Sequence, residues 1–234
     1  MDLASVDLHE TFAFKKVITM TALIKKMGWL LFWTIIVGLS LYFYIQTFVE
    51  YAAGYTPPNF LKGFFESKIW FIGHILGASA SLLLGPLQFS DKLRVRYTKY
   101  HRTAGKVFVI GSLLASMCAF RINLMYDCAA CRISLGILSF IWFFVTAAAW
   151  WAIKNKNIKA HRQFMVRSYT AALAFVFIRI FTLTGYKSVF PFLNDQMQRR
   201  ISAEWLCWVI PFLIIEIYMI WLPSLRKGVQ KIKN

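Results

Sequence analysis

Two short basic motifs, each containing a histidine, recur in this chain. KYHR occupies residues 99–102 and KAHR occupies residues 159–162; each follows a run of positive charge and opens a long apolar segment. The chain has only four histidines. Two imidazoles, here His101 and His161, can ligate a b-type haem iron or another metal, or bind an acidic headgroup together with their neighbouring arginines. The rest of the chain must position the histidines and arginines of these two motifs.

Apolar segments of membrane-spanning length carry the motifs. Hydrophobic residues make up 59% of the chain and aromatic residues 18%, which is too apolar for a soluble domain of this length. Crossing ~30 Å of hydrocarbon takes about 20 apolar residues in a helix. Six such runs are predicted, at 28–49, 69–89, 106–126, 132–153, 167–186 and 204–222. They lack the alternation of a membrane barrel, so the sequence predicts an all-α bundle of six transmembrane helices.

The predicted organisation has three parts. Residues 1–27 form an N-terminal cytoplasmic or interfacial segment, within which residues 8–24 suit a helix lying in the membrane interface. Residues 28–222 form the six-helix domain, and residues 223–234 form a basic cytoplasmic tail.

The distribution of charge predicts the orientation. The net charge is +17, and 19 of the 27 basic residues fall on one side of the six predicted helices, against six on the other. By the positive-inside rule both termini are cytoplasmic, as expected for a multi-pass protein of the inner (cytoplasmic) membrane. Basic loops at this position indicate anionic lipid headgroups as partners rather than nucleic acid.

The geometry of the duplicated motif favours a haem. The third and fifth predicted helices run in the same direction, so His101 and His161 share one depth. Small residues continue the His101 face of its helix, leaving room beside it for a macrocycle. They are Gly105, Ser112, Ala115, Ser116, Ala119 and Asn123. The basic residues that could pair with haem propionates are Arg102, Arg162 and Arg167. The predicted cofactor is one haem b, with His101 and His161 as its metal ligands. If no haem is bound, no other cofactor is expected.

Further polar residues lie inside the predicted helices, where charge is costly and usually finds a partner. His74 and Arg179 are predicted near the external surface, and Gln88 and Glu216 nearer the cytoplasm; these four are the candidate site for a substrate anion or a quinone. Arg179 is expected to pair with Glu216, with Glu204 or with a bound anion. His74 suits either an interhelical hydrogen bond or a ligand contact. Glu204 is expected to cap the sixth helix.

Two cysteines lie three residues apart in the external loop between the third and fourth predicted helices. Cys128 and Cys131 can form a structural disulfide, remain as free thiols or act as a redox dithiol. No second pair exists to complete a zinc site of four thiolates.

Several spaced motifs resemble those of a known family. They are GPLQF at 85–89, HRTAGKV at 101–107 and HRQFMVRSY at 161–169, followed by Arg179 and Glu216. Over roughly residues 65–222 the chain resembles the bacterial membrane proteins grouped as domain of unknown function 2306. It departs from them at Phe164, where they typically have tryptophan, and at Phe212, where they often have asparagine. The layout of histidines on helices is similar to that of b-type cytochromes and ferric reductases, which is an analogy.

Two main functions remain open from the sequence. The first is a membrane redox protein with one b-type haem that exchanges electrons with a quinone near His74 and Arg179. The alternative is a transporter or a lipid- or anion-binding protein with no redox cofactor, and an accessory subunit is a third class. The sequence indicates no catalytic residues for a hydrolase or a zinc enzyme.

Overall fold

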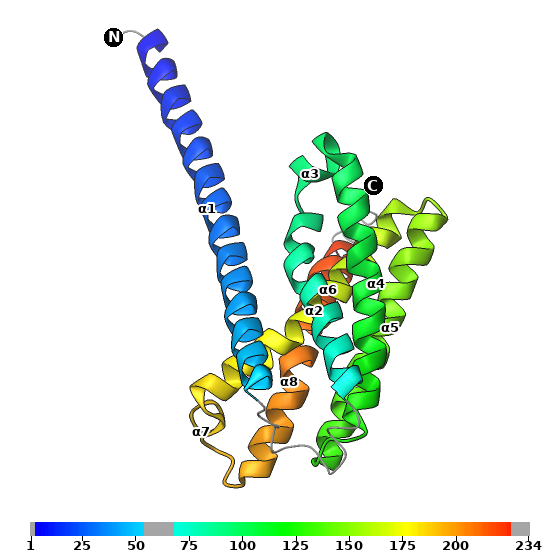
Figure 1. Ribbon diagram of the computed structural model, residues 1–234. Helices are drawn as coiled ribbons and strands as arrows, with labels where there is room; N and C mark the ends of the chain where they lie inside the picture. Colours follow the sequence, from blue (N-terminus) through cyan, green and yellow to red (C-terminus); the bar gives the residue numbers. More distant parts are fainter. Residues whose placement is uncertain (1–2, 54–67, 226–234) are drawn as a thin grey trace.

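The chain folds into an all-helical bundle (Figure 1). The computed structural model describes residues 3–53 and 68–225. Its helices are α1 (Leu3–Ala52), α2 (Lys68–Gln88), α3 (Asp91–Arg96), α4 (Thr98–Asn123), α5 (Ala129–Lys154), α6 (Ile158–Thr184), α7 (Tyr186–Val189) and α8 (Gln196–Glu216), and α8 continues into a π-helical turn, η2 (Ile217–Trp221). Within the described residues, six helices are long and apolar enough to cross a membrane. The predicted fold, a six-helix membrane bundle, is confirmed.

Three of these helices begin earlier than the apolar runs predicted. α4, α6 and α8 begin at Thr98, Ile158 and Gln196 rather than at 106, 167 and 204. Hydropathy detects the part of a helix inside hydrocarbon, whereas a capping side chain can set where the helix starts. The Asn157 carboxamide accepts from the Ala160 N–H at 3.0 Å, and the Asp195 carboxylate accepts from the Gln198 N–H at 3.0 Å.

These earlier starts move two predicted features. His101 and His161 lie in the first turns of α4 and α6, ahead of the apolar runs that begin at 106 and 167. Glu204 was expected to cap the sixth helix, but it lies two turns inside α8 and is only 3% exposed.

The N-terminal segment also differs from the prediction. Residues 3–52 form one continuous helix, so residues 8–24 are not a separate interfacial helix. In Figure 1 the first part of α1 extends well beyond the rest of the bundle. Of the predicted basic tail, residues 226–234 lie outside the described residues.

The tightest helix pair in the core is α2 with α4. A Cβ atom built on Gly77 would lie 2.4 Å from the backbone oxygen of Gly111, so the two backbones are in direct contact. One turn further along, the hydroxyls of Ser81 and Ser112 share a hydrogen bond of 2.7 Å. Small residues and hydroxyl pairs are the usual means of close helix association in membranes, where apolar burial alone gives little driving force.

The two ends of the bundle differ in charge and chemistry. The start of α1, helix α3, the α5–α6 connection and the end of α8 lie at one end, while α7 and the α4–α5 connection lie at the other (Figure 1). Cys128 and Cys131 form a disulfide at this second end. The charge-based prediction makes this second end external. We name the two ends cytoplasmic and external after that prediction.

Candidate functional site

His101 is held by the last residue of α2. In the orientation that satisfies both of its polar atoms, the Gln88 amide donates to Nδ1 of His101 at 3.2 Å and accepts from the Gly105 N–H at 3.3 Å. A neutral imidazole that accepts at Nδ1 carries its proton on Nε2. His101 is therefore oriented as a donor through Nε2.

His161 has the opposite arrangement. Its Nδ1 lies 2.9 Å from the backbone oxygen of Ala149. A carbonyl only accepts, so Nδ1 carries a proton, and in the neutral form of the ring Nε2 is the nitrogen with the lone pair. The structure brings His101 and His161 to the same end of the bundle, within electrostatic range of each other.

The arginines of the two motifs stay at the surface. Arg102 and Arg162 are exposed, and in the described parts of the chain neither forms an ion pair. Arg94 also acts on His101 electrostatically, and it pairs with Asp91. The cytoplasmic end therefore carries a cluster of cationic side chains, Arg94, Arg102 and Arg162. Of these, Arg94 forms an ion pair, with Asp91.

The face of α4 that carries the small residues is largely packed against another helix. Ser112 and Ala115, which the sequence assigned to a haem face, are fully buried, and their stretch of α4 packs against α2 at Gly77 and Ser81. Nearer the histidines, the ring of Tyr169 lies so close to Gly85 that an added Cβ would be 2.1 Å from it.

The deep charge pair differs from the predicted one. Glu216 is bound by Arg167 rather than by Arg179, with Nη2–Oε2 at 2.8 Å and Nε–Oε1 at 2.5 Å. The expected Arg179–Glu216 pair is therefore wrong. Arg179 instead donates to the hydroxyl of Thr47 on α1 at 3.4 Å and lies over the ring of Phe175.

His74 forms an interhelical hydrogen bond. Its Nδ1 donates to the Ala115 backbone oxygen at 2.9 Å, linking α2 to α4. Beside it lies a cavity of about 40 Å³, bordered also by Ser40, Tyr44 and Thr47. A water needs roughly 10–15 Å³ of such space, so this cavity suits water and is too small for a quinone ring. Gln88 and Glu216 lie elsewhere, so the four residues of the predicted anion or quinone site do not form one site.

A much larger cavity was not predicted. It measures about 590 Å³ and opens between α1, α6 and α8. Its apolar lining includes Trp33 of α1, Leu173 of α6 and Ile210 of α8, with Thr170 as one of its few polar side chains. Ile215 of α8 also lines it, so the Arg167–Glu216 pair lies next to its cytoplasmic end. No sequence pattern predicts this cavity, because the cavity depends on how α1 is placed against α6 and α8.

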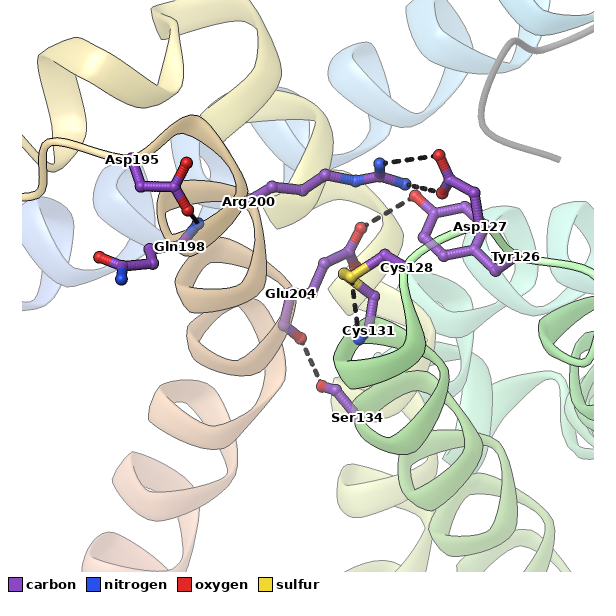
Figure 2. The surroundings of a disulfide bond; sticks show 9 residues. All are labelled: Tyr126, Asp127, Cys128, Cys131, Ser134, Asp195, Gln198, Arg200 and Glu204. Carbon is purple, nitrogen blue, oxygen red and sulfur yellow. Dashed lines mark hydrogen bonds and ion pairs between the residues drawn. A yellow bond between two sulfur atoms is a disulfide. The ribbon is translucent and has the colours of Figure 1, made fainter.

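The external end holds a polar network that the sequence also missed (Figure 2). The Tyr126 hydroxyl donates to Oε1 of Glu204 at 3.1 Å, and the guanidinium of Arg200 lies 4.6 Å from the Tyr126 ring centroid. Arg200 in turn pairs with Asp127 at 3.0 Å. Burial, and then the Glu204 charge, raise the pKa of Tyr126 far above its usual range, so it stays protonated and remains a donor.

The same network ties α8 to α5. The Ser134 hydroxyl donates to the backbone oxygen of Glu204 at 2.8 Å and accepts from Nε1 of Trp208 at 3.0 Å. The Cys128–Cys131 disulfide closes the first turn of α5 beside it (Figure 2). Across the described residues, no three histidine, cysteine or acidic side chains are grouped so as to hold a metal ion.

Comparison with known proteins places the chain in a family. Residues 71–219 match the family model described as predicted membrane protein, DUF2306, so the chain belongs to that family. No curated protein and no solved structure matches it. The matched region runs from α2 into η2 and leaves α1 outside.

Proposed function

We propose that this DUF2306 membrane protein binds a single membrane amphiphile, a molecule with an acyl or isoprenoid chain and a polar head, in the cavity between α1, α6 and α8. The observation that carries this proposal is the size and apolar lining of that cavity, about 590 Å³. Anionic phospholipids and quinones share this chemistry.

The head of the ligand has to provide the selectivity. A hydrocarbon chain gains little by moving from bilayer to an apolar cavity, because lipid tails are as apolar as the lining. Polar contacts at the cavity end therefore decide which amphiphile stays. The Arg167–Glu216 pair lies next to that end, and the Arg167 side chain is 14% exposed. The cationic groups of the cytoplasmic end favour a head that is anionic or accepts hydrogen bonds.

Filling the cavity should remove the ligand. We expect the Thr170→Trp/Ile210→Trp variant, in which both changed residues line the cavity, to retain about tenfold less amphiphile than the unchanged protein, a loss of ~1.4 kcal/mol. Native mass spectrometry of the detergent-purified protein measures the retained molecule, and its mass distinguishes a phospholipid from a quinone.

The matched control places two tryptophans on the outer face of α5. Ile133 and Ile137 are 61% and 40% exposed, so Ile133→Trp/Ile137→Trp should retain the ligand at the unchanged level. Equal retention by the two double variants, or no retained amphiphile in the unchanged protein, would contradict the proposal.

A b-type haem protein is the second candidate function. It is favoured by His161, whose Nδ1 donates to the backbone oxygen of Ala149 and so leaves Nε2 as the nitrogen that could bind a metal. A second hydrogen bond of this kind is usual for a metal-bound histidine. A bound haem would supply one-electron transfer. The remaining residues fit it poorly: Gln88 places the His101 proton on Nε2, and Arg167, expected at a propionate, is bound by Glu216.

An absorption spectrum separates the two candidates. Protein purified from cells supplied with haem should be colourless if the cavity binds an amphiphile alone. A Soret band that disappears in both His101→Ala and His161→Ala, and persists in His74→Ala, would establish the haem protein instead. His74 serves as the control because its Nδ1 is bonded to Ala115, away from the other two histidines.

A further inference from the structure

We propose that Glu204 is a proton-exchange site that opens to the external end of the bundle through Tyr126. This inference is independent of the ligand in the α1–α6–α8 cavity. It rests on the surroundings of a carboxylate that lies inside a membrane-spanning helix.

The first observation is that Glu204 is poorly compensated. It is 3% exposed, and its carboxylate accepts one hydrogen bond from the described residues, that of Tyr126. A carboxylate has about four acceptor positions. Arg200 acts on it only at a distance, since the guanidinium is paired with Asp127. The other carboxylate of α8, Glu216, is better compensated, because the Arg167 guanidinium donates to both of its oxygens.

Ionised groups buried in this way either find partners or take up a proton. Glu216 has found a partner. For Glu204, with one neutral donor, taking up a proton is the remaining way of lowering the cost of burial.

The second observation is a continuous polar route from Glu204 to the surface (Figure 2). The Tyr126 hydroxyl lies 3.1 Å from Glu204, and Arg200 lies over the Tyr126 ring. Arg200 then reaches Asp127, whose side chain is 36% exposed. On the other sides, the route is bounded by the closed disulfide and by Ser134 with Trp208. The proton is therefore exchanged with water at the external end.

The groups around Glu204 leave few other candidates for titration. From the α4–α5 connection come Tyr126 and Asp127, and from α8 itself come Arg200 and Cys207. Helix α5 contributes Ser134 and the disulfide, which does not titrate. Arg199 turns away to donate to the backbone oxygen of Phe190 at 3.3 Å.

The transfer conserves protons and involves no electrons. The Tyr126 hydroxyl passes its proton to Oε1 of Glu204, and in the same step the tyrosine oxygen takes a proton from a hydronium ion on the side of Arg200 and Asp127, which becomes water. Because the pKa of Tyr126 is raised by burial and by Glu204, a free tyrosinate is not formed. The net change is one proton moved from external water to Glu204.

Infrared spectroscopy tests this directly. In proteoliposomes, lowering the pH of the medium facing the external end should produce the carbonyl band of a protonated carboxyl group. The band should be absent in Glu204→Gln, which keeps the side-chain shape, and present in Glu50→Gln, a control at the external end of α1. Tyr126→Phe should slow the appearance of the band after a pH jump by tenfold or more.

Three outcomes would overturn the proposal. They are a band that persists in Glu204→Gln, the absence of any titrating band in the unchanged protein, and an unaltered rate in Tyr126→Phe. Thermal unfolding of each variant in the same detergent establishes that it is folded before its spectrum is compared. A folded Glu204→Gln variant that lacks the band supports the proposal.

Discussion

Replacing Arg167 with leucine is expected to lower the free energy of unfolding by about 3 kcal/mol, because Glu216 is left charged and unpaired inside the bundle. This is the low end of the usual range for a broken buried pair, since the Glu216 side chain is 31% exposed. Unfolding in a detergent titration measures the loss.

Two comparisons isolate the pair. The double variant Arg167→Leu/Glu216→Leu should recover most of the loss, because both charges are then gone. Arg162→Leu, at an exposed position on the same helix, should have little effect. Strictly additive losses for Arg167 and Glu216 would show that the two side chains do not interact in the membrane. The same cycle with Arg179 is expected to be additive, because its hydrogen bond is to Thr47.

Gly77→Ala is expected to destabilise the bundle by about 3 kcal/mol, the upper part of the range for overpacked cores. The added Cβ would lie 2.4 Å from the Gly111 oxygen and 3.0 Å from the Ala115 nitrogen. Both are backbone atoms, so the contact is relieved only by separating α2 from α4. Thermal unfolding monitored by circular dichroism gives the change.

The control for this substitution is the same change at Gly136 of α5. A Cβ there meets nothing within 4 Å, and alanine is up to ~1 kcal/mol better than glycine inside a helix. Gly136→Ala should therefore be neutral or stabilising. Equal destabilisation by the two alanines would mean that α2 and α4 do not pack through Gly77.

The transmembrane helices could be predicted from sequence because a bilayer imposes one strong condition on every spanning segment. The limits of the helices could not. Residues 98–105 include Lys99 and Arg102 and have no apolar run, yet they are helical because a helix can continue past the hydrocarbon. Glu204 was misplaced for this reason, since the start of α8 depends on Asp195.

The pairing of side chains was harder to predict than their depth. From the sequence, Arg167 is expected at a haem propionate and Glu216 beside Arg179, whereas the structure pairs Arg167 with Glu216. The pair could not be predicted from the depth of each residue, because depth along a helix says nothing about how the helix is rotated toward its neighbours. The Tyr126–Glu204 contact joins residues 78 positions apart, across three helices, and no local pattern encodes it.

Helix α1 has a mechanical consequence. At 1.5 Å per residue its 50 residues extend about 75 Å, more than twice the ~30 Å of hydrocarbon. Its last half carries Trp29, Phe32 and Trp33, which form one wall of the large cavity. Because the helix is unbroken, tilting its protruding half also moves the three aromatic side chains that form this wall. A change in the tilt of α1 therefore changes how widely the cavity between α1, α6 and α8 is open.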